Sequence, residues 1–354
     1  MILRPNLPDT CILSQSLTAS QTFKSKRLEL VNFDQPFFTH GIDVLTDPEE
    51  QDYVYIYAVN HLPSPEFLAY LAEHHPDRDS ITHNTVIPDE IPRARSQLEI
   101  FRHRLGSSTA THLRSMRHPL LRTPNDVLAS GDGRSVYVTN DHFYTAGQMR
   151  SIEDIWYYAR WTDTVHLQID DLESRNETAG FKASVALTGL HNNNGLGRGA
   201  SEGEMVITSA ASGDVHIATP RDNQSTLGVK ESFHLDSSLD NPSYFVDQYA
   251  SSPEDDRSGY VIAGLTKAAD LLQSAHNPNA TEPVVVWLVR KGADGDKSRR
   301  NVTVLFEDDG SRIRSASGAV MKAIDPALED GRRRAWLFVT GFFSRDMIAV
   351  KIDL

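Results

Sequence analysis

Two Asn-Asp pairs frame a predicted β-hairpin in the middle of the chain. Asn125-Asp126 stands at the start of its first strand and Asn140-Asp141 at the end of its second, with a Gly-Asp-Gly turn between the strands. Alternation and turn chemistry predict antiparallel pairing, which brings the two pairs to matched ends. Ca²⁺ takes about six to eight oxygen ligands, and amide and carboxylate groups supply them. The hairpin is therefore a candidate calcium site, although Asn-Asp also simply begins turns.

Further polar clusters stand at predicted strand or loop junctions elsewhere in the chain. They are Thr39-His40-Gly41-Ile42, Val59-Asn60-His61, the segment 191–196 around Asn194, and Leu239-Asp240-Asn241-Pro242. Together they offer oxygen donors for a calcium ion and an imidazole that could serve as a general base. Each cluster also has a structural interpretation. His40 and His61 could be ordinary strand-end histidines, and the Asn-rich run and the Asp-Asn-Pro segment are both typical of turns.

Length and composition are typical of a globular protein. The chain has 354 residues, 39% of them hydrophobic and 23% charged, and its Gly and Pro residues do not gather in a linker. We therefore expect one domain over residues 1–354. The formal net charge of −13 argues against a nucleic-acid surface, because phosphate binding needs clustered Lys and Arg. An acidic chain is equally compatible with solubility and with cation binding.

Cysteine content and the N-terminal sequence bear on the compartment. Cys11 is the single cysteine, which excludes an intrachain disulfide and a thiolate metal cage. There is no run of 18 apolar residues that could span a membrane and no signal-peptide pattern, so the chain as written is expected to stay in the cytoplasm. Four Asn-x-Ser/Thr triplets, at Asn176, Asn223, Asn279 and Asn301, point weakly to export.

Short strands dominate the predicted secondary structure. The apolar, β-branched segment 53–61 predicts a buried strand, and the His- and Pro-rich residues 62–97 predict a surface insertion with a short helix at 66–73. Residues 151–161 predict a helix with a Ser N-cap, whose aromatic residues would pack inward. Strands then recur at intervals of roughly 8 to 15 residues. This spacing predicts an all-β sandwich, barrel or propeller. We favour the β-propeller because the strands are many and a loop with polar residues follows about every fourth one.

At the polar clusters the chain resembles the serum paraoxonase/arylesterase family of calcium-dependent esterases, lactonases and phosphotriesterases. The matching segments occur in the family's order: His-Gly-Ile at 40–42, Val-Asn-His at 59–61, Asn-Asp at 125–126, Thr-Asn-Asp-His at 139–142, Asn-Gly-Leu at 194–196 and Asp-Asn at 240–241. Each motif alone is weak, but the ordered series is specific. The likeness extends from about residue 26 to the C-terminus.

The resemblance implies a six-bladed β-propeller that holds two calcium ions and hydrolyses small aryl esters or lactones, and organophosphate triesters as a further substrate class. The implied ligands of the catalytic calcium are Asn125, Asn194, Asp240 and Asn241, and those of the structural calcium are Asp126 and the backbone carbonyl of Ile42. By the same resemblance His40 is the general base and His61 its relay. Asp141 would orient this pair.

One departure from the family pattern concerns the N-terminal region. The family carries a Glu-Asp pair before its first catalytic histidine, whereas no Glu-Asp dipeptide lies among the 39 residues before His40. We therefore expect an incomplete first blade, as in a truncated chain, or weakened calcium binding. Two alternatives follow. One is a catalytically inactive propeller that serves as a binding scaffold, and the other is a propeller enzyme of the gluconolactonase or strictosidine-synthase type. The His-Gly-Ile and Val-Asn-His segments favour the arylesterase type.

Overall fold

Strands account for most of the regular structure, which confirms the all-β prediction. The computed structural model describes residues 13–16, 24–75, 87–221, 224–274, 277, 279–291 and 300–354. Cys11, Asn223 and residues 76–86 of the predicted insertion lie outside these ranges. The chain divides into two compact units, the first comprising residues 1–153 and 161–189 and the second residues 154–160 and 190–354. That all of them form a single propeller domain stays a prediction.

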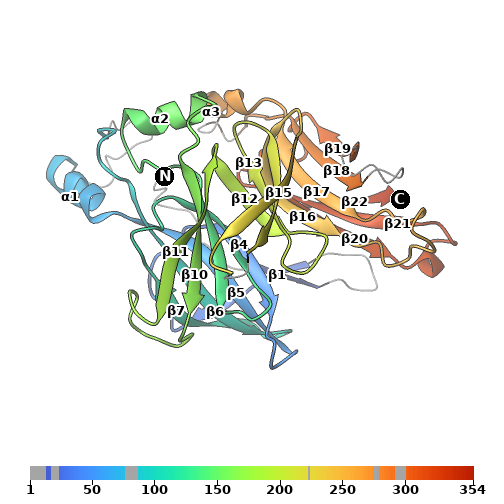
Figure 1. Cartoon of the computed structure of the whole chain (residues 1–354), viewed down its shortest axis with the longest axis horizontal. Helices are drawn as coiled ribbons and strands as arrows, with labels where there is room; N and C mark the ends of the chain where they lie inside the picture. Colours follow the sequence, from blue (N-terminus) through green and yellow to red (C-terminus); the bar gives the residue numbers. More distant parts are fainter. Residues whose placement is uncertain are drawn as a thin grey trace. The chain divides into compact units, whose positions relative to one another are not determined.

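The first unit contains two larger sheets (Figure 1). One has the order β3-β7-β6-β5-β4, and the other is the meander β11-β10-β9-β8, while β1 and β2 pair as a separate hairpin. The strand bounds are β1 Leu13–Ser16, β2 Lys24–Arg27, β3 Glu29–Val31, β4 Thr39–Thr46, β5 Tyr53–Pro63, β6 Ala94–Arg104, β7 Thr109–Met116, β8 Pro124–Ala129, β9 Ser135–Asn140, β10 Thr162–Ile169 and β11 Phe181–Leu190. The hairpin predicted around the Gly-Asp-Gly turn is thus confirmed as β8 and β9.

The second unit contains a four-stranded meander and a seven-stranded sheet. The meander is β12 Asn193–Arg198, β13 Met205–Ser209, β14 Asp214–Pro220 and β15 Leu227–His234. The larger sheet joins two further meanders through a single bridge between Asn241 and Gly318. Their strands are β16 Ser238–Phe245, β17 Gly259–Leu265, β18 Val284–Lys291 and β19 Arg300–Asp308, followed by β20 Ala316–Ile324, β21 Arg334–Gly341 and β22 Ile348–Asp353.

Successive meanders within each unit lie side by side, with their first strands in contact. β4 contacts β8 in the first unit, and β16 contacts both β12 and β20 in the second. Adjacent first strands at the start of antiparallel meanders are the blade arrangement of a β-propeller. The described residues form five such meanders, the last of them three-stranded. A total of six blades, which the family resemblance implies, stays a prediction.

The hydrophobic core of each unit fills the spaces between neighbouring meanders. In the first unit, Val59 and Ile100 pack with Val138 of the next meander, while Ile56 and Phe101 face the opposite side of their sheet. Both faces of β5 are therefore buried, which explains its nearly continuous apolar sequence. Each such Val or Ile stabilises the fold by roughly 1.5 to 3 kcal/mol when it is fully buried. In the second unit the cores likewise join β13 and β14 to β17, and β17 and β18 to β21.

The helices are short and lie in connections between strands. The predicted helix in the insertion is confirmed as α1, Pro65–His74, whose N-cap is the hydroxyl of Ser64. The predicted helix 151–161 is corrected to α2, Gln148–Ile155. It begins after Gly147, whose φ of +84° is not helical, and ends before Trp156. The aromatic residues that follow do not pack inward as predicted, because Trp156 and the two following tyrosines are exposed. The remaining helical elements are α3, Leu271–Ser274, and two short 3₁₀ turns, Ala268–Asp270 and Pro326–Leu328.

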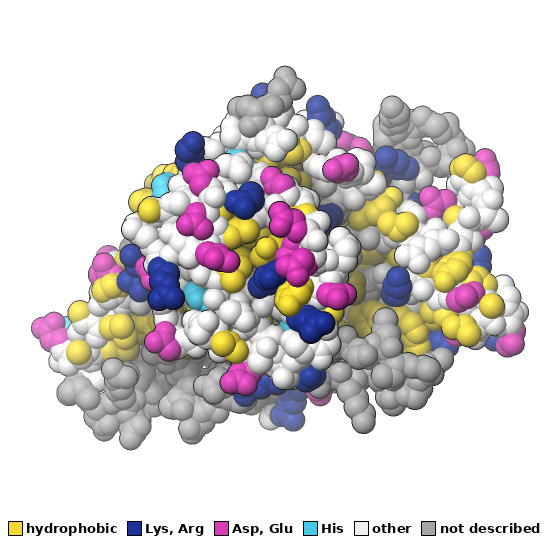
Figure 2. Space-filling view, turned by 90° about the horizontal axis from the view of Figure 1, so that it is seen from below, with side chains coloured by type: hydrophobic (Ala, Val, Ile, Leu, Met, Phe, Trp, Pro, Cys, Tyr) yellow, Lys and Arg dark blue, Asp and Glu magenta, His cyan; other side chains and the backbone are white. Residues whose placement is uncertain are grey.

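The surface charges and the apolar character of the helices bear on whether the chain has a charged binding surface or a membrane span. On the face drawn in Figure 2, acidic and basic side chains of the described residues are interspersed. None of the described helices has the length and apolar character that crossing a membrane requires. That nucleic acid is not a partner stays a prediction.

Candidate active site

Every first strand of the five described meanders contains a break in its pairing register. The breaks lie between Thr39 and Ile42, Pro124 and Val127, Asn193 and Leu196, Leu239 and Pro242, and Ala316 and Gly318. Such β-bulges leave residues unpaired and re-aim their side chains. The bulges contain His40, Asn125-Asp126, Asn194 and Asp240-Asn241. The clusters expected at strand or loop junctions thus lie inside strands, and most predicted site residues occupy their bulges.

The first bulge places His40 beside His61. Nδ1 of His40 lies 3.1 Å from Nε2 of His61, and the two rings meet nearly edge to face at 69°. The strand pairing places Thr39 opposite Asn60, and the N–H of His61 donates to the carbonyl of Phe38. The predicted histidine pair is therefore formed in the first unit by neighbouring strands.

Asn125 lies on the other side of the His40 ring. Its Nδ2 is 3.4 Å from Nε2 of His40, at the long end of a hydrogen bond. Asn125 and Asp126 are both 3% exposed. The structure thus brings the predicted base next to Asn125, a predicted oxygen donor on β8 that is 85 residues away in the sequence.

Both histidines are held in their neutral form at neutral pH. Burial among the surrounding protein atoms lowers the pKa of His40, although the ring keeps an exposed surface, and the charge of Asp141 opposes this change. Burial, reinforced by the charge of His40, lowers the pKa of His61 to about 4. A neutral imidazole has a free lone pair and can accept a proton.

Asp141 acts on the histidine pair through its charge and contacts a neighbouring histidine. Its Oδ1 lies 3.0 Å from Nδ1 of His142. Burial alone would raise the pKa of Asp141, but its hydrogen bond with His142 and the charges of His142, Arg150 and His40 lower it below the ordinary value. Asp141 is therefore ionised and favours a positive charge on the histidine pair.

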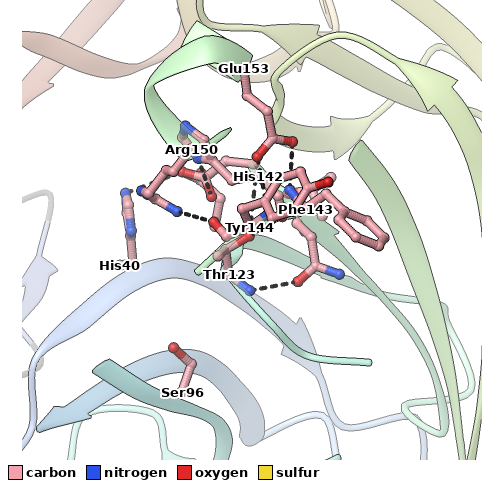
Figure 3. Close-up of polar contacts among 12 residues, drawn as sticks. His40, Ser96, Thr123, His142, Phe143, Tyr144, Arg150 and Glu153 are labelled. Carbon is pink, nitrogen blue, oxygen red and sulfur yellow. Dashed lines mark hydrogen bonds and ion pairs between the residues drawn. The ribbon is translucent and has the colours of Figure 1, made fainter. Parts of the chain in front are cut away.

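The segment that carries Asp141 is fixed by two side chains that the sequence did not single out (Figure 3). Thr123 Oγ1 donates to the carbonyl of His142 at 2.5 Å, and accepts from its N–H at 3.0 Å. The carboxylate of Glu153 accepts from the backbone N–H groups of Phe143 and Tyr144 at 2.7 and 3.0 Å. Glu153 is 1% exposed, so these are charge-assisted hydrogen bonds in a buried setting. A lone buried Glu on a short helix gave no signal in the sequence.

Glycines let the first strands of neighbouring meanders approach closely. A Cβ at Gly41 would lie 2.4 Å from Cα and Oδ1 of Asp126, and a Cβ at Gly195 would lie 2.7 Å from the carbonyl oxygen of Asp240. The hydroxyl of Thr208 also donates to that carbonyl at 2.9 Å. Glycine is needed at both positions because no side chain fits there. Each unit thus gathers its own oxygen donors, Asn125 and Asp126 in the first and Asn194, Asp240 and Asn241 in the second.

One donor oxygen of the second unit is buried without a hydrogen bond. Oδ1 of Asn241 is inaccessible to solvent and has no hydrogen-bond partner among the residues that the structure describes. A buried amide oxygen in that state costs about 1 to 3 kcal/mol, so a cation or a water molecule bound to it would stabilise the fold. Within the described ranges, no three His, Cys, Asp or Glu side chains form a group suited to a metal. Any cation would depend on asparagine and backbone oxygens as well, which are donors that calcium accepts.

The sequence also missed Ser96, which lies opposite His61 on β6 and contacts its ring. A hydroxyl on a neighbouring strand becomes visible only once the pairing register is known.

The first strands of the antiparallel meanders carry His40 and the oxygen donors in their bulges, and His61 lies beside His40 on the neighbouring strand. This arrangement is that of an all-β protein of the β-propeller type. The family model described as Arylesterase matches residues 76–325, and the chain belongs to this family. It is 23% identical to serum paraoxonase/arylesterase 2 of Bos taurus over 285 residues, and 22% identical to serum paraoxonase/lactonase 3 of Oryctolagus cuniculus over 299 residues.

These matches cover 80% and 84% of this chain, and 63% and 67% of the respective relatives. The chain therefore spans about two thirds of the length of the relatives it matches, and 63% of the bovine one. Among solved structures, the periplasmic gluconolactonase of Pseudomonas aeruginosa is similar with a TM-score of 0.43 and 11% identity, covering 99% of this chain and 80% of that one.

Proposed function

We propose that this protein is a calcium-dependent hydrolase of aryl esters or lactones, with His40 as its general base. The observation that carries the proposal is the contact between His40 and His61 in a bulge that also borders Asn125. Membership of the arylesterase family supports the substrate class, since relatives bear the names arylesterase and lactonase. Small esters and lactones share the electrophilic carbonyl that such a site would act on.

In the proposed reaction His40 takes a proton from water at Nε2 while the water oxygen attacks the substrate carbonyl carbon. The Nδ1–H of His40 then donates to His61 Nε2, so that the positive charge is shared by both rings. Asp141, ionised at neutral pH, stabilises this charge. When the carbon–oxygen bond of the substrate breaks, the proton that His40 took from water passes from Nε2 to the leaving oxygen. This transfer returns His40 to its neutral state.

The donor groups of both units suit calcium. Within the first unit the oxygen donors would be Asn125, Asp126 and the carbonyl of Ile42. Within the second unit they would be Asn194, Asp240 and Asn241. Bound calcium would polarise the substrate carbonyl and stabilise the negative charge that develops on its oxygen. The buried, unbonded oxygen of Asn241 is the feature of this chain that supports a cation.

Hydrolysis of a phenyl ester and of a γ-lactone, each measured in millimolar calcium and in EGTA, tests the proposal. We expect turnover in calcium that EGTA abolishes and that added calcium restores. Equal rates in both buffers would refute calcium dependence. If neither substrate is turned over in calcium, the propeller scaffold without catalytic activity becomes the better explanation.

A further inference from the structure

The histidine pair continues into a third group on the next strand. Ser96 lies opposite His61 in the pairing of β5 with β6, and its Oγ is 2.7 Å from Nδ1 of His61. Ser96 is 7% exposed, so water competes little for its hydroxyl. Three groups, His40, His61 and Ser96, therefore form a continuous hydrogen-bonded chain across three strands. Figure 3 shows Ser96 on the strand below His40.

The direction of this chain follows from the chemistry of a neutral imidazole, which carries a single N–H. If His40 is to accept a proton at Nε2, its own proton resides on Nδ1 and donates to His61. His61 must then present a lone pair at Nε2, which places its proton on Nδ1. That proton donates to the hydroxyl oxygen of Ser96. A hydrogen bond at one ring nitrogen thus decides what the other nitrogen can do.

We propose that Ser96 is a positioning residue, which fixes His61 in the Nδ1–H form and thereby keeps His61 Nε2 free to accept from His40. The catalytic part of this inference rests on the proposed function. Among the residues that the structure describes, the charged groups that act on His61 are His40, Asp141 and Arg150. Ser96 is uncharged, so its effect is directional: it determines the tautomer and the ring orientation instead of the charge.

The chain itself offers a matched control. Ser135 is fully buried at the far end of β9, and its Oγ lies 2.7 Å from Nε2 of His166. Removing this hydroxyl deletes the same kind of contact at the same distance, but not next to His40 or His61. Ser135→Ala therefore measures the cost of losing a buried serine–histidine hydrogen bond as such.

The first experiment determines the tautomer directly. Protein with ¹⁵N-labelled histidine is prepared in calcium, as wild type, Ser96→Ala, Ser96→Thr and Ser135→Ala, with His61→Gln used to assign the His61 signals. Long-range ¹H–¹⁵N spectra should show His61 protonated at Nδ1 in the wild type, in Ser96→Thr and in Ser135→Ala. In Ser96→Ala the two ring nitrogens should move toward averaged shifts. A wild-type His61 protonated at Nε2, or an unchanged spectrum in Ser96→Ala, would overturn the proposal whatever the activity.

The second experiment measures phenyl ester hydrolysis by the same variants. The loss of one hydrogen bond should lower kcat of Ser96→Ala by roughly three- to tenfold. KM should stay unchanged, because Ser96 does not touch the substrate. Ser96→Thr should recover most of the rate, and Ser135→Ala should keep it. A changed tautomer without a fall in kcat would refute the catalytic role. If the wild type shows no hydrolysis at all, the proposed function fails while the spectra still decide the tautomer.

Discussion

Gly41 and Asp126, 85 positions apart, lie so close that a single methyl group could not be placed between them. A Cβ added to Gly41 would be 2.4 Å from both Cα and Oδ1 of Asp126, and 2.5 Å from the carbonyl oxygen of Asn125. Two of these three atoms belong to the backbone, so the collision cannot be relieved by turning a side chain. The contact joins the bulge of β4 to the bulge of β8. It thereby sets the distance between the histidine pair and the oxygen donors of the first unit.

Gly41→Ala should therefore lower the free energy of unfolding by about 1 to 3 kcal/mol, since overpacking forces backbone shifts. Calcium-induced stabilisation should fall as well, because the shift displaces Asp126. Denaturant unfolding with and without calcium measures both effects. Gly131→Ala is the control, since a Cβ there would meet nothing within 4 Å. Equal stability of the two variants would show that the strands separate without cost.

Asn241→Leu should act in opposite directions with and without calcium. In EGTA its melting temperature should equal or exceed that of the wild type, because leucine replaces a buried oxygen that lacks a hydrogen bond. In calcium the variant should lose stabilisation, which for a site at a ligand concentration of 100 Kd amounts to about 2.7 kcal/mol. Thermal melting in the two buffers provides the measurement, and Asn301→Leu on the exposed edge strand is the control. If calcium raises the melting temperatures of the wild type and of Asn241→Leu equally, Asn241 is not a calcium ligand.

His40→Gln should lower kcat by roughly 10² to 10⁴, the usual contribution of a general base. His61→Gln should lose less, because His40 can still accept a proton from water without its neighbour. Both variants should retain the calcium-dependent rise in melting temperature, since neither is a proposed ligand. Steady-state kinetics with a phenyl ester and a γ-lactone separate the two variants. Undiminished turnover by His40→Gln would remove this residue from the mechanism.

His61 should make the protein less stable in acid. Its pKa in the folded state is about 4, below the ordinary 6.5, so the unfolded chain binds more protons between these values. The free energy of unfolding therefore rises with pH. The contribution of His61 to it is fully present above about pH 6.5 and is lost as the pH falls toward 4. It amounts to about 2 kcal/mol, less than the full shift implies because the ring keeps some exposure. Urea unfolding of wild type and His61→Gln in EGTA from pH 4 to 7 measures it. Parallel curves for the two proteins would contradict the shifted pKa.

The sequence predicted the strands whose signal is local. The segment 53–61 is β-branched and aromatic almost throughout, and the structure confirms it as part of β5, Tyr53–Pro63. The hairpin of β8 and β9 was predicted from its Gly-Asp-Gly turn. Glycine suits this turn because Gly133 adopts a φ of +65°. β12, β16, β17 and β20 were not predicted as strands. β17 is apolar and its signal is local, so it was predictable and was missed. The other three carry glycine, asparagine or proline at their bulges, and these residues are typical of loops when they are considered without a partner strand.

The sequence by itself determined the residue types of the candidate site and their order, from His40 to Asn241. Those side chains carry the imidazoles, amides and carboxylates, and their chemistry does not depend on the fold. Only the tertiary structure decided which of them meet. A bulge is a property of two paired strands, and register is set by contacts far apart in the chain. Hence the pairing of β5 with β6, which no local pattern encodes, placed Ser96 against His61, and the close packing at Gly41 placed Asp126 beside the histidine strand.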